Sequence, residues 1–451
     1  MASIEKKQEN TELVEKSFVH YLPIVVVGCL ICGVPSAILN SCAGIYYPAM
    51  AQDMGVQVSQ IAMWRTVDYI TGIIASPFAG VWLAKKNSKM VILLAAAIES
   101  LIFILFGSVQ NADQLWMLYL GGGIAGVTNA VMLGVGVAAI MNRWFQSSTG
   151  LVIGICTAFT GIGGVVFTPI GQALIESSGW RTSYITMGIT SLIIMVVGVL
   201  FLMSNRPEDK GMLPYGTAKA RAKAAEEAGK EDAVIPSVRP SVARKSYIFW
   251  LVILFGFLIN TICNINAFFA SYVVWFNAQE TVVSGAVAGA FVTGAELTMF
   301  NSAGNAGGKL ALGLFSDLNL RNTIIALCAC GIVGLFFMWQ FPNTVLLPVG
   351  SVLMGCFIAA VLVVMPMTVR AVFGSGAAYP IIWSNIGMSL GLGGACGSYI
   401  WAFISENFGG YDAVFSVALI LMFILMAVGL FVYSKREILP REELTEEDLT
   451  V

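Results

Sequence analysis

Charged side chains are scarce in this sequence. Asp, Glu, Lys and Arg make up 11% of its 451 residues, whereas soluble globular domains carry about 25%. Hydrophobic residues make up 57% of the chain, and the mean hydropathy is +0.82. The shortage of charge excludes a soluble globular protein of ordinary composition and predicts that lipid surrounds most of the side chains.

Histidine is rarer still, and no basic or acidic block dominates the chain. The single histidine, His20, cannot form a catalytic triad or a zinc site by itself. The formal net charge is −2, and the sequence contains no run of basic residues. It therefore lacks the electrostatic pattern of a nucleic-acid-binding protein. All nine cysteines lie inside apolar runs, where a thiol usually packs as a small hydrophobe. We therefore expect no enzyme activity, no cofactor and no nucleic-acid partner.

Long apolar runs, in contrast, recur along the chain. A run of about 20 apolar residues is long enough to cross a bilayer as a helix. The first six runs lie near residues 22–50, 58–84, 90–110, 115–141, 149–175 and 182–204. The second six lie near residues 246–276, 283–313, 321–341, 346–372, 378–404 and 412–434. The sequence predicts an all-α membrane protein with twelve transmembrane helices.

Polar segments divide these runs into two bundles of six. We expect an N-terminal segment at 1–21, bundles at 22–204 and 246–434, a linker at 205–245 and an acidic tail at 435–451. All but three of the 24 lysines and arginines fall on one side of the membrane if the helices alternate in direction. The positive-inside rule then places both termini and the linker in the cytoplasm.

The two predicted bundles resemble each other at a constant offset. Glycine and glutamate recur 230 residues later in five cases: Gly161, Gly163, Gly164, Glu176 and Gly179 correspond to Gly391, Gly393, Gly394, Glu406 and Gly409. Transporters are commonly internal duplications with the solute site between the repeats. The pattern predicts such a pseudo-symmetric pair.

These features resemble the major facilitator superfamily over nearly the whole chain. The residues from Gly308 to Gly313, with Asp317 and Arg321, are similar to the superfamily's loop signature between its eighth and ninth helices. In that family the loop links helix ends on the cytoplasmic face. The resemblance therefore implies a conformational role for Gly313, Asp317 and Arg321.

A second group of motifs resembles the monocarboxylate porter and oxalate/formate antiporter branches: Asn142 to Phe145, Gly161 to Gly164, Gly179 to Arg181, and Arg206 to Gly211. Those branches carry a cation in helix eight that meets the substrate carboxylate, and the matching position is Lys309. The monocarboxylate porters carry a proton-relay aspartate one turn earlier, and here that position is Asn305. The second cation of the oxalate branch is missing, because residues 380–404 contain no lysine or arginine. A doubly charged substrate is therefore less expected.

Ionisable residues inside predicted spans are functional candidates, because burying a charge in lipid is costly. Arg65 and Lys309 could attract a carboxylate, and Asp68, Glu99 or Glu296 could carry a coupling proton. Structural alternatives remain open. Lys309 could extend to the membrane surface, Arg65 could pair with Asp68 three residues later, and Glu99 could serve a helix contact.

Neutral polar residues can orient a solute without a buried charge. The helices that line the cavity in the superfamily are the first, fourth, seventh and tenth. The resemblance thus points to Tyr47, Asn129 and Asn264, together with Asn305 of the eighth helix. Tyr47 could equally belong to the aromatic belt at the membrane surface.

The sequence predicts a secondary transporter in the cytoplasmic membrane of a bacterium. We expect it to move a small organic anion, a monocarboxylate, by alternating access, with either a proton or a counter-substrate as coupling partner. An exporter of an apolar or cationic compound and a dicarboxylate exchanger are the alternatives. The expected partners are the substrate and the lipid bilayer, and we expect a monomer.

Overall fold

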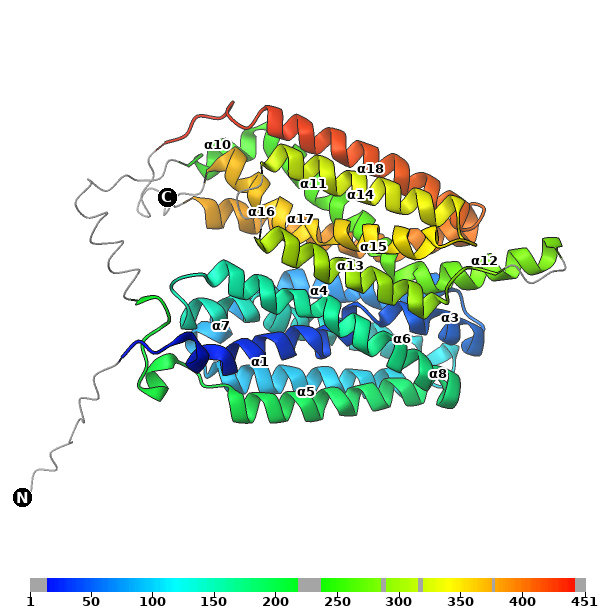
Figure 1. The fold of residues 1–451 in the computed structure, drawn as a ribbon, viewed down its shortest axis with the longest axis horizontal. Helices are drawn as coiled ribbons and strands as arrows, with labels where there is room; N and C mark the ends of the chain where they lie inside the picture. The colour runs from blue at the N-terminus through cyan, green and yellow to red at the C-terminus, as the bar shows by residue number, and fades with distance from the viewer. Residues whose placement is uncertain (1–13, 218–236, 285–288, 315–318, 375–377, 443–451) are drawn as a thin grey trace, which may run out of the picture.

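The computed structural model describes residues 14–217, 237–284, 289–314, 319–374 and 378–442. Within these ranges the chain is almost entirely helical, and the only β contacts are isolated bridges such as Phe145 with Tyr215. Figure 1 shows the helices running side by side in two stacked groups, with the described ends of the chain at the same end of the molecule. We call that end the terminal end and the opposite one the far end.

The first group is formed by the chain up to Leu202. Its elements are η1 (Phe18–Tyr21), α1 (Leu22–Gly33), α2 (Pro35–Asn40), α3 (Ala43–Met54), α4 (Val58–Lys85), α5 (Ser88–Gly107), η2 (Ala112–Gln114), α6 (Leu115–Asn129), η3 (Ala130–Gly134), α7 (Gly136–Trp144) and α8 (Thr149–Leu202). We refer to this group as the N half.

The second group follows two short elements of the linker, η4 (Pro207–Lys210) and α10 (Pro240–Lys245). Its elements are α11 (Tyr247–Cys263), η5 (Asn264–Phe268), α12 (Phe269–Ser284), α13 (Gly294–Leu314), α14 (Leu320–Gln340), α15 (Leu346–Ile358), α16 (Ala360–Phe373), α17 (Tyr379–Asn407) and α18 (Tyr411–Ser434). We refer to it as the C half.

Nine helical segments in the described part of the chain are long and apolar enough to cross a membrane. One of them, α8, has 54 residues and would be about 80 Å long if straight. It turns back at Gly179, whose φ of 83° suits glycine, and so passes twice. With α13 and the pair α15 and α16, the segments make twelve passes. The expected all-α architecture of twelve transmembrane helices in two bundles is thus confirmed.

The internal duplication is visible in the helix boundaries. Helices α8 and α17 begin at Thr149 and Tyr379, which are 230 positions apart. The pass that starts at Thr149 turns at Gly179, inside α8, and α17 is followed by a turn at Gly409; the φ angles of these glycines are 83° and 94°. The equivalent turns explain why glycine occurs at both Gly179 and Gly409, since other residues are strained at such angles.

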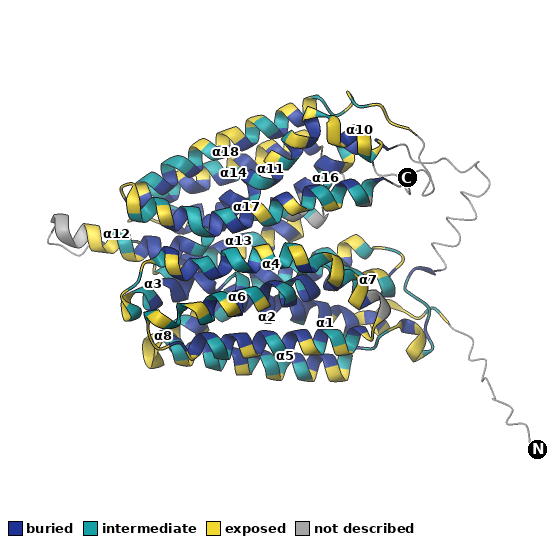
Figure 2. Cartoon of the chain, turned by 180° about the vertical axis from the view of Figure 1, so that it is seen from behind, coloured by how far each residue is buried: buried dark blue, intermediate teal, exposed yellow. Residues whose placement is uncertain are grey.

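The outer faces of both halves are apolar. Figure 2 shows exposed residues along the outward faces of α5 and α18 and buried residues between the helices. Large side chains such as Phe78, Leu101, Ile193 and Ile420 are each more than half exposed. An apolar surface of this kind is suited to contact with lipid tails.

One predicted boundary is wrong. The eighth helix was expected to start near residue 283, but α13 starts at Gly294, and α12 continues to Ser284. The Thr293 hydroxyl accepts a hydrogen bond from the Glu296 backbone N–H, and the Glu296 carboxylate accepts one from the Thr293 N–H. This reciprocal pair is a capping box, which defines where a helix begins.

Candidate functional site

Four passes are broken near their middle, and they are the first, fourth, seventh and tenth. The first is interrupted at Val34, whose φ and ψ are −114° and −85°, and the fourth by the π-helical turn η3. The seventh contains the 3-10 turn η5, and the tenth changes helix at Ala359. Breaks in buried membrane helices free backbone groups for a solute or an ion and commonly mark transport sites.

Lys309 lies on α13 at the boundary between the halves and is 9% exposed. Its Nζ donates a hydrogen bond to Thr160 Oγ1 of α8 at 2.7 Å and lies 3.4 Å from the Thr157 carbonyl oxygen. Thr160 is 11 residues into α8, about 16 Å from the start of that helix. The ammonium group therefore points into the protein and does not extend to the membrane surface.

No carboxylate of the described residues pairs with Lys309. Its electrostatic neighbours are the thiols of Cys32 in α1 and Cys263 at the end of α11. One turn earlier, the Oδ1 atom of Asn305 is buried without a hydrogen-bond partner in the described part of the chain. The site thus combines an ammonium group with a neutral amide where the monocarboxylate porters carry an acid.

Arg65 is also buried, but it has an anionic partner. Its Nη1 lies 2.9 Å from Asp68 Oδ2 on the same face of α4. Its Nη2 donates to Tyr69 Oη at 3.4 Å, and Tyr69 donates to Asn264 Oδ1 at 3.2 Å. Ser398 of α17 donates to the same Asn264 oxygen. A polar chain therefore runs from α4 in the N half to η5 and α17 in the C half.

Glu99 is fully buried in the middle of α5. Its Oε2 accepts a hydrogen bond from Thr128 at 2.9 Å, and Asp68 and Arg65 act on it electrostatically. Asn129, the next residue of α6, lies beside Asp68 and donates to Asn40 Oδ1 at 3.5 Å.

Two other candidates lie toward the far end. Tyr47 is fully buried on α3, and its ring packs against Phe268 of η5, with the centroids 5.8 Å apart. Tyr47 Oη has no hydrogen-bond partner among the described residues. The tyrosine thus lies between the halves and does not belong to an aromatic belt at the membrane surface.

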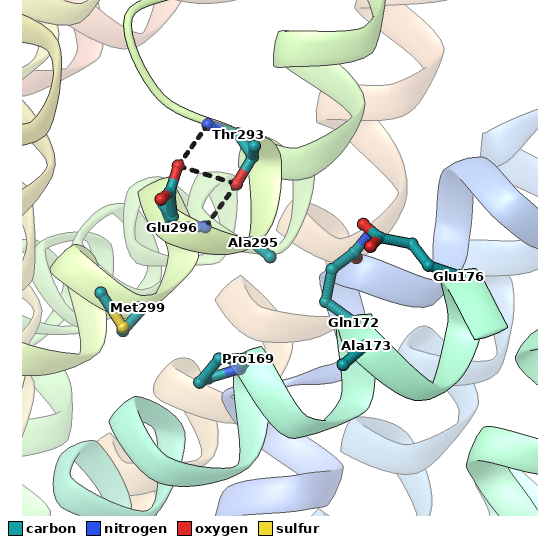
Figure 3. Close-up of a pocket in the computed structure, with 8 residues that line it drawn as sticks. All are labelled: Pro169, Gln172, Ala173, Glu176, Thr293, Ala295, Glu296 and Met299. Carbon is teal, nitrogen blue, oxygen red and sulfur yellow. Dashed lines mark hydrogen bonds between the residues drawn. The ribbon is translucent and has the colours of Figure 1, made fainter.

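Glu296 lies at the exposed start of α13. Figure 3 shows it turned back to Thr293, across an open crevice from Gln172 and Glu176 of α8. The crevice has a volume of about 430 Å³ including its mouth. The expectation that Glu296 is buried within its helix is wrong, because the helix starts two residues before it.

Of the conformational loop, Asp317 lies outside the described residues. Gly313 belongs to the last turn of α13, and Arg321 to the first turn of α14. The Arg321 N–H donates to the side chain of Asn319, which caps α14.

The two halves touch closely at several places between the far end and the middle of the molecule. Ser59 donates two hydrogen bonds to the Glu406 carboxylate, and Thr66 donates to the Ala395 carbonyl at 2.8 Å. A Cβ atom at Gly161 would lie 2.5 Å from the Ser302 carbonyl oxygen. Such contacts are possible only where small residues let two helices approach.

The same helix faces separate toward the terminal end. Gly154 lies seven residues before Gly161, and Gly387 lies seven before Gly394, so each pair shares one face of a helix. A Cβ at Gly394 would meet the Tyr69 ring at 2.6 Å. At Gly154 and Gly387 it would meet nothing within 4 Å. The halves therefore diverge toward the terminal end.

Sequence reasoning missed Tyr69, Thr160 and Ser398. Tyr69 and Thr160 each join a candidate residue to the opposite half, and Ser398 joins Asn264 to another helix of the same half. Contacts between distant helices have no periodic signal in the sequence. Only the position of Tyr69, one turn after Arg65, could have suggested its role.

Comparisons with known proteins identify the family to which the chain belongs. The family model of the Major Facilitator Superfamily matches residues 29–295, more than half of the chain. The chain is 24% identical over 189 residues to monocarboxylate transporter 12 of Mus musculus, an alignment that covers 42% of this chain and 38% of that protein. It is 28% identical over 177 residues to a probable L-galactonate transporter of Escherichia coli K12, covering 38% of each. The alignments thus span about two fifths of these curated relatives.

Solved structures agree at the level of the fold. The nucleoside transporter NupG has a TM-score of 0.65 at 14% identity and covers 93% of this chain and 99% of its own. A bacterial homologue of the lysosomal transporter Spinster, solved facing inward, has a TM-score of 0.57 at 12% identity, covering 94% and 97%. The chain belongs to the major facilitator superfamily, a family of multi-pass membrane transporters.

Proposed function

We propose that this transporter moves a small organic anion, a monocarboxylate, and that Lys309 binds its carboxylate. The observation that carries the proposal is a buried ammonium group held only by neutral groups of the described residues, at the boundary between the halves. A buried cation without a counter-ion is costly. An anionic solute bound there would offset that cost.

The balance of charge supports a single negative charge on the substrate. Arg65 is already paired with Asp68 at 2.9 Å, so among the buried cations of the described residues Lys309 is the one without an anionic partner. The Asn305 amide, the Asn264 amide and Tyr69 offer hydrogen bonds for the rest of the solute. A dicarboxylate would need a second cation, and the described part of α17 carries none.

The arrangement of the halves suggests how the site reaches either side. The two halves are in close contact at Ser59 and at Gly394. At Gly154 and Gly387, nearer the terminal end, a Cβ would meet nothing within 4 Å. We infer that the site opens toward the terminal end in this state and that rocking of the halves opens the far end in turn. Lys309 and Asn264 each form a hydrogen bond to the opposite half, so a solute bound to them would be coupled to the relative movement of the halves.

The orientation of the protein in the membrane is part of the same proposal. We propose that the terminal end is cytoplasmic, with an N-terminal segment at 1–21, bundles at 22–204 and 246–434, a linker at 205–245 and a tail at 435–451. Lysine and arginine gather at that end, as the positive-inside rule requires.

The proposal is tested by counterflow of labelled monocarboxylates in proteoliposomes. We expect saturable exchange by the wild type, and loss of most of it in Lys309→Ala. Lys210→Ala is the matched control, because Lys210 is exposed on η4. Unchanged exchange in Lys309→Ala would remove the lysine from the site.

A second candidate function is export of an apolar or cationic compound. Two buried acids of the N half, Asp68 and Glu99, favour it, because such acids attract cations. Competition between protons and a lipophilic cation, with no response to monocarboxylates, would support this alternative.

A further inference from the structure

We propose that Glu99 carries the coupling proton, in a buried cluster with Asp68 and Arg65 that is separate from the anion site at Lys309. The inference rests on the proposed function, since it assigns the coupling partner of that transport. The monocarboxylate porters place a proton-relay aspartate next to their substrate cation, where this chain has Asn305. If a proton is coupled, another acid must bind it.

Glu99 is fully buried but accepts too few hydrogen bonds to be stable there as an anion. The residue has no exposed surface. One carboxyl oxygen accepts a single hydrogen bond from Thr128, and the other has no partner in the described part of the chain. A permanently ionised carboxylate in such a place would normally be surrounded by donors or paired with a cation.

The charges nearby cannot all be balanced. Glu99 and Asp68 are two carboxyl groups, and one guanidinium, Arg65, acts on both. Asp68 holds the direct ion pair at 2.9 Å, and its second oxygen is also unpaired among the described residues. One proton shared by the two carboxyl groups makes the cluster neutral. Two carboxyl groups that share a site rarely ionise together.

In the described part of the chain, the helices packed around Glu99 offer no other charged group that would make the cluster neutral without a proton. The elements packed on α5 are α2, α4, α6, η3 and α8. Helix α2 and the turn η3 have no ionisable side chain, and Tyr119 of α6 lies nine residues, about two and a half turns, before Thr128. The ionisable residues of α8 are Cys156, Glu176, Arg181 and Tyr184. Among the described residues, the charged groups that act on Glu99 are Asp68 and Arg65.

The cluster is placed to influence the contact between the halves. Arg65 links Asp68 to Tyr69, and Tyr69 donates to Asn264 of the C half. With Glu99 ionised, two carboxylates hold the guanidinium inside the N half. With Glu99 protonated, only Asp68 does so. The proton therefore biases the hydrogen bond that crosses the boundary, which is a physical route for coupling.

The π-helical turn η3 gives the cluster a route for the proton. Thr128 lies two residues before this turn, and the half-buried pair Asn129 and Asn40 leads from Asp68 toward the broken first pass. In the step itself a hydronium ion transfers a proton to a carboxylate oxygen of Glu99, so that one O–H bond of the hydronium breaks, one O–H bond forms on the carboxyl group and a water molecule remains. Release is the reverse transfer to another water molecule.

The test measures proton movement and substrate exchange in the same proteoliposomes. A pH-sensitive dye inside the vesicles reports protons, and labelled monocarboxylate reports exchange. For Glu99→Gln, which keeps the shape of the side chain, we expect substrate-driven proton movement to fall to background while exchange persists at a measurable rate. Glu176→Gln, a change at an exposed acid of α8, should keep the wild-type ratio of the two signals.

Infrared difference spectra give a second readout that needs no substrate. A pH change should produce a carboxylic acid band in the wild type that is lost in Glu99→Gln, so the proposal is tested even if monocarboxylates are not transported. Failure of wild-type exchange overturns the proposed function. A Glu99→Gln variant that keeps both the band and proton movement overturns the present inference, as would proton movement lost only in Asp68→Asn or uptake driven by sodium instead of protons.

Discussion

Substitution of Gly161 by alanine should push α8 and α13 apart near the middle of the molecule, where the two halves meet. The added Cβ would lie 2.5 Å from the Ser302 carbonyl oxygen and 2.6 Å from the Ala306 backbone nitrogen. Ordinary contact begins near 3.4 Å, so α8 and α13 must separate by roughly 0.9 Å. Backbone atoms cannot turn aside as a flexible side chain could.

The size of the effect follows from the cost of overpacking, about 1–3 kcal/mol. That cost falls only on the state in which the far end is closed. The ratio of the two states should therefore shift by about 5- to 150-fold toward an open far end. Gly154→Ala is the matched control, because its Cβ would meet nothing within 4 Å.

Spin labels carried by unnatural amino acids at Ser177 and Asn407 would report the far end, since both residues are exposed there. Double electron–electron resonance should show a longer distance for Gly161→Ala than for the wild type and Gly154→Ala. If the distance distributions of the three proteins are the same, the close packing of α8 on α13 does not hold the far end closed.

Three further changes test the polar contacts. Asp68→Asn leaves a buried guanidinium without its partner and should destabilise the protein by about 3–5 kcal/mol, seen as a lower melting temperature in detergent; a loss below about 1 kcal/mol would mean that another anion replaces Asp68. Glu406→Gln weakens both hydrogen bonds from Ser59 and should raise the population with an open far end several-fold, measured with the same labels; an unchanged population would show that this contact is incidental. Asn305→Asp places an acid one turn before Lys309 and should raise the Kd for a monocarboxylate by about tenfold or more, measured by calorimetry; tighter binding would contradict the assignment of the lysine.

Much of the fold could be predicted from the sequence, because lipid imposes a simple rule on helix length and composition. The turns at Gly179 and Gly409 follow from the duplicated glycine pattern. The start of α13 was misplaced, because the signal that defines it is a local capping pair, Thr293 with Glu296, inside a segment that still reads as apolar.

The candidate site was predictable in part. Arg65 and Asp68 pair as their spacing on one helix face suggested. The hydrogen bonds from Lys309 to Thr160 and from Tyr69 to Asn264 join helices more than 140 residues apart in the chain. No pattern along one helix encodes such contacts, because they depend on how the two halves dock.

The most direct test of the account is binding of a small monocarboxylate and of its neutral amide to the purified protein, measured by calorimetry for the wild type and for Lys309→Gln. A hydrogen bond to a charged group contributes about 1.5–3 kcal/mol, so the wild type should bind the carboxylate at least about tenfold more tightly than the amide, and the variant should bind both equally weakly. Equal affinity of the two proteins for the carboxylate would contradict the central claim that Lys309 binds the substrate anion.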